Sequence, residues 1–347
     1  MARIAAQAIP SLKSQIDALT SDATGAPGVV FAAVNKQGES IFEHASGTVG
    51  VGKSQAMTMD NVFWIASCTK MITGIACMQL VEQGKLALDD VALVEKLAPV
   101  TGFAYAFFDD RINDWAGPLG IDEFSGSYHD YLSQPLVNQP GEVWEYGINI
   151  DWAGQLVERA SGLKLNDYFQ QHIFGPMGLK HISMFPSDSM RADLAYMNAR
   201  APDGTLSLNP DGHLNRRPLF AKTKEEIDTT FHAGGAGCFA RPTDYAQIIA
   251  TVLNDGVHPG TGATILKKET VDTMFTNQIP EMPNFGRQAI TPPKPMYANA
   301  LPELYPEPHD IPQGWGLTFF LHLRESAVHS EGTGWWAGHI NNICVSQ

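Results

Sequence analysis

Cysteine is scarce in this sequence, and the few that occur are far apart. Four stand among 347 residues, with no C-x-x-C pair between them: Cys68, Cys77, Cys238 and Cys344. Zinc ribbons and redox-active dithiols need such pairs, so neither class is supported. The 11 histidines offer no substitute, because none belongs to the His-Glu-x-x-His pattern of zinc hydrolases. We therefore expect neither a metal ion nor another cofactor.

Long hydrophobic runs and positive charge are also in short supply. No apolar stretch reaches membrane-spanning length, and the first residues lack the apolar core of a secretory signal. With 23 basic against 37 acidic side chains, the formal charge of −14 argues against nucleic acid or a membrane as a partner. We therefore expect a cytoplasmic protein with free thiols. Its 44% of hydrophobic residues is ample for a large core.

The apolar pattern predicts both helices and strands. Helical spacing appears in four segments, the last of which opens at Pro242 with Thr243 as its expected N-cap: 4–20, 67–83, 152–161 and the stretch after 242. Short β-rich runs predict three strands: 29–34, 40–45 and 315–321. The helix from 67 to 83 has few polar positions, so we expect it to be buried.

Two residues at the start of that buried helix form a candidate catalytic pair. Ser67 lies where unpaired backbone N–H groups and the positive end of the helix dipole favour a developing alkoxide. Lys70 lies one turn later on the same face, where burial would let it accept the serine proton. Ser161 and Lys164 have the same spacing, but a helix-ending Gly162 lies between them. The helix context therefore favours Ser67, against the simpler interpretation of an N-cap beside a surface lysine.

Two further motifs carry groups that acyl transfer needs. Tyr146 precedes a helix, and a phenol placed there can relay a proton within a cleft, although a core tyrosine is the simpler interpretation. Trp336, Ala337 and Gly338 combine small residues with a strand-like run. Such a strand can direct a backbone N–H at an oxyanion together with the N–H of Ser67, although a glycine-rich turn explains the pattern equally.

The three motifs occur in the order found in the β-lactamase-like serine hydrolases. The run from Trp144 to Leu163 resembles most the fungal acyltransferases of lovastatin biosynthesis and their esterase relatives. The likeness extends to the helix after Ser67 and to the glycine-rich stretch 234–237, and so covers most of the chain. Several ordered motifs are far more specific than a single Ser-x-x-Lys match.

The resemblance implies an α/β (α+β) fold like that of serine β-lactamases and penicillin-binding proteins, with an antiparallel sheet flanked by helices. Residues 1–99 and 230–347 would form the sheet-containing part from both ends of the chain. Residues 100–229 would form a mainly helical part, all within one domain.

The resemblance also implies a role for each motif. Ser67 would form the acyl-enzyme, with Lys70 and Tyr146 as its proton relay. The Trp336–Gly338 strand and Asn149 would line the oxyanion and substrate pocket. True β-lactamases begin the third motif with Lys or His, whereas this chain has Trp336 and therefore lacks the cation that would bind a β-lactam carboxylate.

These features predict a serine esterase or acyltransferase acting on a small-molecule ester or acyl thioester, and the resemblance adds a setting in fungal secondary metabolism. The sequence does not indicate whether coenzyme A or a protein supplies the acyl group. A β-lactamase or D-Ala-D-Ala-type peptidase is one alternative, and an inactive truncated relative is the other. The second alternative rests on two departures from the family pattern, a connection that is missing near Val100 and the strands and helix that are missing after Gly338. From these departures we expect low stability or weak activity.

Overall fold

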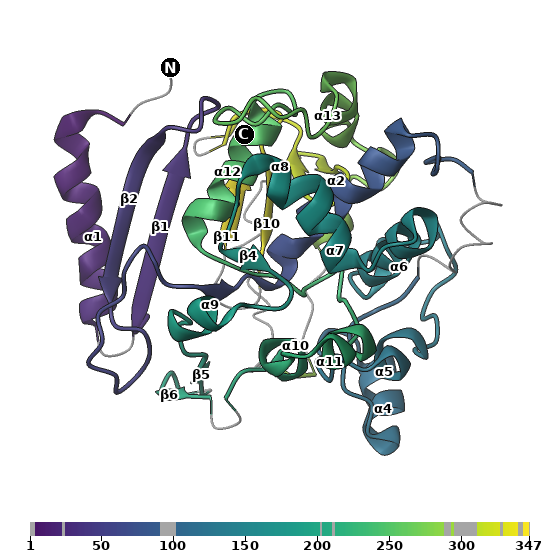
Figure 1. Cartoon of the computed structure of the whole chain (residues 1–347), viewed down its shortest axis with the longest axis horizontal. Coiled ribbons are helices and arrows are strands. Elements are labelled where there is room, and N and C mark those ends of the chain that lie inside the picture. The colour runs from purple at the N-terminus through teal and green to yellow at the C-terminus, as the bar shows by residue number, and fades with distance from the viewer. Residues whose placement is uncertain are drawn as a thin grey trace.

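The computed structural model describes residues 4–22, 25–90, 102–201, 203–209, 212–287, 293–294, 311–326 and 329–338, and the backbone of 343–346. Antiparallel strands and helices alternate along these residues, so the predicted fold class is confirmed. Figure 1 shows α1, β2 and β1 together at one side of the molecule. At another side lie four helices: α4 (Asp110–Leu119), α5 (Tyr128–Leu132), α10 (Arg216–Phe220) and α11 (Lys224–Thr229).

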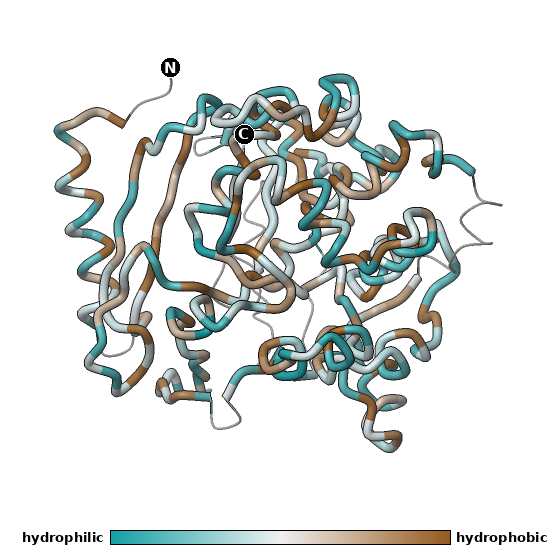
Figure 2. Tube along the Cα trace, viewed as in Figure 1, coloured by the Kyte–Doolittle hydropathy of each residue, from teal (hydrophilic) through white to brown (hydrophobic). Residues whose placement is uncertain are grey.

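The amino-terminal layer is a helix packed on a hairpin. After a short turn of 3₁₀-helix (Ala6–Ala8), α1 (Ile9–Ser21) contacts β1 (Gly28–Val34) and β2 (Ser40–Gly47), which pair antiparallel. Hydrophobic and hydrophilic segments alternate along α1 (Figure 2), as expected for a helix with one face on a sheet. The predicted helix and both predicted strands are therefore confirmed.

The second sheet has four antiparallel strands in the order β11-β10-β9-β8. Their bounds are Gln313–Trp315 for β8, Phe320–His322 for β9, Gly334–Ala337 for β10 and Ile343–Ser346 for β11. The prediction of one strand over 315–321 was wrong. The chain turns back at Thr318, whose φ is +88°, while the N–H of Leu317 donates to the carbonyl of Met274 instead of to a neighbouring strand.

The structure differs from two expectations about the ends of the chain. We expected the family's strand after Gly338 to be missing, but β11 pairs with β10 from Gly334 to Ala337. We also expected one sheet from both ends of the chain. Among the described residues, β1–β2 and β8–β11 are instead two separate sheets, with α12 (Pro242–Leu253) against β1. The expected gap near Val100 lies outside the described residues.

The buried helix α2 (Thr69–Glu82) lies at the centre of the core and packs against α6 and α7. Eleven of its residues are buried, which confirms the prediction from its apolar composition. The start of α12 differs from the prediction. Its N-cap is Arg241 and Pro242 occupies the first turn, so Thr243 is not the cap.

The remaining elements are short and connect these layers. Three two-residue strands form a small sheet in the order β3-β7-β4: Phe63–Trp64, Phe239–Ala240 and Ile182–Ser183. β5 (Asn198–Arg200) and β6 (Leu206–Leu208) form a hairpin. The helices between 110 and 275 are α4 (Asp110–Leu119), α5 (Tyr128–Leu132), α6 (Asn149–Ser161), α7 (Leu165–Phe169), a π-helical turn (Gln170–Phe174), α8 (Gly175–Met177), α9 (Asp188–Ala192), α10 (Arg216–Phe220), α11 (Lys224–Thr229) and α13 (Lys268–Met274).

The structure bears on the expectations about membrane-spanning segments and about the cysteines. Within the described ranges, every helix is too short or too polar to cross a bilayer. Among the described residues, Cys77 and Cys238 are free thiols. The division into a sheet-containing part and a helical part stays a prediction.

Candidate active site

Ser67 lies at a sharp turn between a strand and the central helix. β3 leads through Ile65 into one turn of 3₁₀-helix (Ala66–Cys68), and α2 follows. Ala66 is buried and has a φ of +41°, in the left-handed region that costs free energy for any residue but glycine. Strained backbone of this kind is concentrated at functional sites. The turn places Ser67 at the amino-terminal end of α2, where the helix dipole is positive.

Three predicted residues meet at this turn. The Oγ of Ser67 lies 2.6 Å from the hydroxyl oxygen of Tyr146, and the Nζ of Lys70 donates to the same Oγ at 3.0 Å. The ammonium also lies 4.7 Å from the centre of the Tyr146 ring. Lys70 is only 2% exposed, so its charge is held inside the protein. The structure thus brings Ser67, Lys70 and Tyr146 into mutual contact.

The competing Ser-x-x-Lys match has no such geometry. The hydroxyl of Ser161 donates to the carbonyl of Val157 at 2.6 Å, within its own helix. Lys164 donates to the hydroxyl of Tyr128 at 2.6 Å. Ser161 and Lys164 are thus each bound to other groups, and the choice of Ser67 over Ser161 as the nucleophile stays a prediction.

Lys70 has two further partners that the motifs did not predict. Its Nζ donates to the hydroxyl of Tyr105 at 3.2 Å and to the carbonyl of Gly235 at 2.9 Å. With the contact to Ser67, the three ammonium N–H donors have three acceptors. Gly235 belongs to the glycine-rich stretch that the resemblance included, whereas nothing in the sequence around Tyr105 indicated this contact.

Asp151 lies behind Tyr105 and is the only carboxylate that the described residues bring into this hydrogen-bonded group. Its Oδ2 accepts from the Tyr105 hydroxyl at 3.4 Å, and its Oδ1 accepts from the N–H of Gly235 at 2.9 Å. The residue is 1% exposed. Burial raises the pKa of the carboxyl to about 6, although Lys70 and the Gly235 N–H both favour the ionised form.

The stretch 234–237 has to be glycine-rich because it passes close to these groups. A Cβ on Gly235 would lie 2.6 Å from Asp151 Oδ2 and 2.8 Å from the Tyr105 hydroxyl. A Cβ on Gly234 would lie 2.6 Å from the carbonyl oxygen of Ile150. The Thr73 hydroxyl of α2 donates to the Gly234 carbonyl at 2.7 Å and fixes the stretch against the helix.

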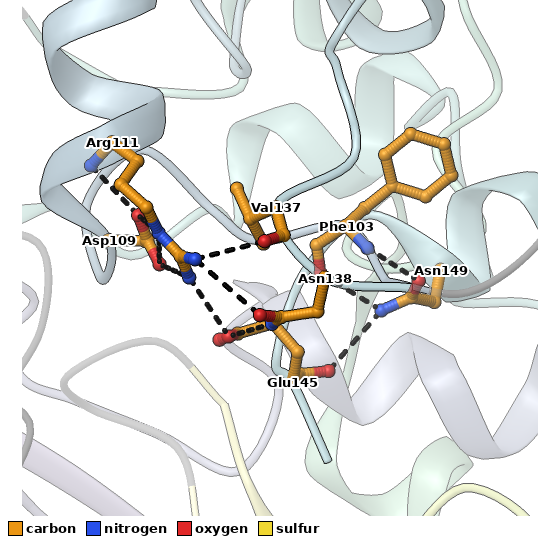
Figure 3. Close-up of polar contacts among 7 residues, drawn as sticks. All are labelled: Phe103, Asp109, Arg111, Val137, Asn138, Glu145 and Asn149. Atoms are coloured by element: carbon orange, nitrogen blue, oxygen red, sulfur yellow. Dashed lines mark hydrogen bonds and ion pairs between the residues drawn. The ribbon is translucent and has the colours of Figure 1, made fainter. Parts of the chain in front are cut away.

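Asn149 has a different position from the one expected. We predicted that it would line the pocket, but its side chain pairs with backbone next to the site (Figure 3). Its Oδ1 accepts from the N–H of Phe103 at 3.4 Å, and its Nδ2 donates to the carbonyls of Phe103 and Glu145, each at 3.3 Å. The N–H of Tyr105 also donates to the carbonyl of Tyr146 at 3.2 Å. Asn149 therefore ties together the two backbone segments that carry Tyr105 and Tyr146.

The side chain of Glu145, next to Tyr146, is bound by the polar side chains of Asn138 and Arg111 (Figure 3). The amide of Asn138 donates to Glu145 Oε2 at 3.0 Å, and a guanidinium nitrogen of Arg111 lies 3.7 Å from the same oxygen. Arg111 also donates to the carbonyl of Val137 at 2.9 Å and pairs with Asp109 at 2.6 Å. The Arg111 side chain lowers the pKa of Asp109, whereas burial raises that of Glu145.

Trp336 reaches the site as predicted, but with its side chain. Its Nε1–H donates to the Tyr146 hydroxyl oxygen at 3.0 Å. Half-buried rings continue from this contact, since Trp144 lies 6.1 Å from Tyr146 and Trp315 lies 4.7 Å from Trp336 between ring centres. Phe285 packs on Trp144 at 4.9 Å. These rings form an aromatic cluster beside Tyr146 (Trp144, Phe285, Trp315 and Trp336).

A small cavity of about 20 Å³ lies between the start of α2 and β10. Its walls come from α2, α12, the β8–β9 turn and β10: Ser67, Cys68, Met71, Tyr245, Ile249, Thr318, Phe319, Trp335 and Trp336. A space this size holds about one water-sized atom. β10 pairs with β9 only as far as Trp335, whereas its pairing with β11 continues to Ala337, just before Gly338. The role of Ala337 and Gly338 as oxyanion donors stays a prediction.

Comparisons with known proteins point to one family. The family model described as Beta-lactamase matches residues 15–341. Lovastatin esterase of Penicillium rubens is 29% identical over 91% of this chain and 87% of its own. Monacolin J acid methylbutanoyltransferase of Aspergillus terreus is 28% identical over 72% of this chain, and the match spans just under two thirds of its own length, 66%. Esterase EstB of Burkholderia gladioli is 26% identical over 75% of each chain.

Solved structures agree on the fold. Unliganded simvastatin synthase of Aspergillus terreus matches with a TM-score of 0.73 at 23% identity, over 96% of this chain and 88% of that one. EstCE1, described as a hydrolase with promiscuous acyltransferase activity, matches with a TM-score of 0.71 at 20% identity over 96% and 88%. A penicillin-binding protein homologue of Pyrococcus abyssi matches with a TM-score of 0.62 over 91% and 65%.

Proposed function

Because the chain belongs to the beta-lactamase family, we propose that it transfers acyl groups through an ester on Ser67, with Lys70 and Tyr146 as the proton relay. The chain is a serine hydrolase or acyltransferase, as its esterase and acyltransferase homologues are. One observation carries the assignment of the residues. The Ser67 oxygen lies 2.6 Å from the Tyr146 hydroxyl and 3.0 Å from the Lys70 nitrogen, within the range required for proton transfer.

In the first half of the reaction, Ser67 Oγ attacks the carbonyl carbon of the ester. Its proton passes to the Lys70–Tyr146 pair, which before the attack must hold one proton fewer than an ammonium and a phenol together. With Lys70 as the ammonium, the Tyr146 oxygen accepts the proton. The carbonyl oxygen becomes an oxyanion in the space between α2 and β10. When the bond to the alcohol oxygen breaks, the pair returns the proton to that oxygen. The alcohol leaves and the acyl group stays on Ser67.

The second half uses the same groups in reverse. Water or a second alcohol attacks the acyl carbon and gives its proton to the pair, and Ser67 Oγ recovers a proton as the ester breaks. Water gives hydrolysis, whereas an alcohol gives acyl transfer. The aromatic cluster supports binding of an apolar alcohol or acceptor next to Tyr146, since large rings exclude water from that side.

The third motif favours esters over β-lactams. At the position where β-lactamases carry Lys or His, this chain has Trp336, whose indole donates to Tyr146 instead of binding a carboxylate. We therefore place a small-molecule ester or acyl thioester first and a β-lactam or D-Ala-D-Ala peptide second. Secondary metabolism is supported by the names of the fungal relatives, which act on lovastatin and monacolin J. A cytoplasmic setting is supported by the free thiols of Cys77 and Cys238.

Turnover of p-nitrophenyl acetate and butyrate, measured beside nitrocefin, tests the reaction. We expect both esters to be hydrolysed faster than nitrocefin. Ser67→Ala should abolish turnover and the covalent mass adduct formed with a slow ester. Ser161→Ala is the matched control and should keep the wild-type rate. Faster nitrocefin turnover would favour the β-lactamase alternative, and a large loss in Ser161→Ala would contradict the choice of serine.

The relay has its own test. Lys70→Ala and Tyr146→Phe should each lower kcat by roughly 10²- to 10⁴-fold, the usual range for groups that move protons. Their combined effect should be far smaller than the product of the single effects, because the two residues act as a unit. Independent effects would contradict a shared relay.

A further inference from the structure

A closed ring of hydrogen bonds surrounds Lys70 on the side away from Ser67. The Lys70 ammonium donates to the Tyr105 hydroxyl and to the Gly235 carbonyl, at 3.2 Å and 2.9 Å. Both partners lead to Asp151, through the Tyr105 hydroxyl at 3.4 Å and the Gly235 N–H at 2.9 Å. The ring fixes the lysine nitrogen at two points, and its third bond then falls on Ser67 Oγ.

The direction of each bond in the ring follows from which groups can donate. The ammonium has no lone pair, so the Tyr105 oxygen must accept from it. The Tyr105 hydrogen is then free for Asp151, which as a carboxylate only accepts. A neutral or missing group at 151 would leave the Tyr105 hydrogen free to turn toward other acceptors and would remove the negative charge behind Lys70.

Every part of this ring is buried. Lys70, Tyr105 and Asp151 are 2%, 5% and 1% exposed. An unpaired ammonium at such a site would carry a large desolvation penalty, so a nearby carboxylate is the expected compensation. The surroundings of Asp151 supply Lys70 as the cation, while the other titratable groups facing it are Tyr105 and Tyr131, with Glu123 beyond them.

We propose that Asp151 and Tyr105 are positioning residues that hold the Lys70 nitrogen against Ser67, with Asp151 as the buried counter-ion of that lysine. The proposal rests on the function proposed above. Neither residue touches the reacting atoms, so both act through Lys70. Gly235 is part of the same device, because a side chain there would displace Asp151 and Tyr105 together.

The test combines two variants with one matched control. Asp151→Asn removes the charge and keeps the shape, and Tyr105→Phe removes the single oxygen between lysine and carboxylate. Glu123→Gln is the control, because Glu123 is also buried but is hydrogen-bonded by backbone groups of Ala106 and Phe107 instead of by Lys70. The readouts are kcat, KM and the pH profile for p-nitrophenyl acetate, and the rate at which a fluorophosphonate labels Ser67.

We expect kcat and the labelling rate to fall roughly 10- to 100-fold in both variants, as for other partners that orient a catalytic group, with little change in KM. The wild type should lose activity as the pH falls through about 6, where Asp151 takes up a proton. Asp151→Asn has no carboxylate left to protonate and should lack this step, whereas Glu123→Gln should keep both the wild-type rate and the step.

Wild-type rates and an unchanged pH step in folded Asp151→Asn would overturn the proposal. If Asp151→Asn does not fold, Tyr105→Phe decides, and a wild-type labelling rate in that variant overturns the proposal equally. If Glu123→Gln loses the pH step, the step belongs to Glu123 and the counter-ion assignment fails. A wild-type chain that neither hydrolyses the ester nor reacts with the fluorophosphonate would instead remove the proposed function on which the inference rests.

Discussion

Because Asp151 is buried, the free energy of unfolding depends on whether its carboxyl group is charged. Its pKa in the folded chain is about 6, raised by desolvation from an ordinary 3.8. The unfolded chain therefore releases this proton at lower pH than the folded chain does. The stability that Asp151 contributes is complete below about pH 4 and is lost as the pH rises through 6.

Asp151→Asn should lack this loss, because asparagine has no proton to release. The melting temperature of the wild type relative to that of the variant should therefore fall between pH 4 and pH 8. The absolute difference at pH 8 also contains the loss of the carboxylate beside the buried Lys70 ammonium, which by itself destabilises the variant. Thermal melts of both proteins at pH 4 and pH 8 measure the change. An equal difference at the two pH values would show that Asp151 keeps the same charge at both.

Of the five residues in the hydrogen-bonded group around Ser67, the sequence predicted three and missed two for a physical reason. Ser67 and Lys70 share one helix, so their contact follows from helical spacing alone. Tyr146 became visible through its motif. Tyr105 and Asp151 come together only by tertiary packing, and nothing local distinguishes a buried aspartate from an exposed one.

At the scale of the element, the segment between α5 and α6 determines where Tyr146 lies. The Asn149 side chain is hydrogen-bonded to the backbone of Phe103, and the Arg111 guanidinium lies 3.7 Å from the Glu145 carboxylate (Figure 3). Arg111 is half-exposed, with 56% of its side-chain surface accessible. An exposed ion pair contributes little to global stability, so its loss should act mainly on the position of the segment.

Arg111→Ala should lower kcat of ester hydrolysis roughly tenfold, because small displacements of a catalytic group carry large penalties. The melting temperature should change by only a few degrees. Arg111→Lys is the informative comparison, since it keeps the charge but cannot bind Asp109 and the Val137 carbonyl with one planar group. Recovery by Lys would show that charge alone is sufficient, and full activity in Arg111→Ala would show that Asn149 holds the segment without help.

Element boundaries followed the sequence where contacts are local and departed from it where they are not. The first helix, the β1–β2 hairpin and α2 were predicted from periodicity and turn residues. The strand predicted over 315–321 failed because Thr318 turns the chain and Met274, far away in sequence, takes the hydrogen bond of Leu317. Long-range contacts of this kind have no local pattern.

At the scale of the whole molecule, the site is assembled from distant parts of the chain. Ser67 and Lys70 come from the start of α2, Tyr146 from before α6, Gly235 from the glycine-rich stretch and Trp336 from β10. The resemblance to a family predicted this arrangement, which spacing alone could not have done. It did not predict that the strands from the two ends would pair as separate sheets.

The contact between Trp336 and Tyr146 also gives the protein an optical signal of its own. Three of its seven tryptophans lie in the aromatic cluster, and one of them donates to the phenol that touches Ser67. Once Ser67 carries an acyl group it has no hydroxyl hydrogen, so the polarity around the Trp336 indole changes. Stopped-flow emission with a slow ester should therefore change at the rate at which alcohol is released, and the signal should disappear in Trp336→Phe. A chromogenic substrate would then be unnecessary, and the reaction of each candidate natural ester could be followed by the tryptophan fluorescence of the enzyme itself.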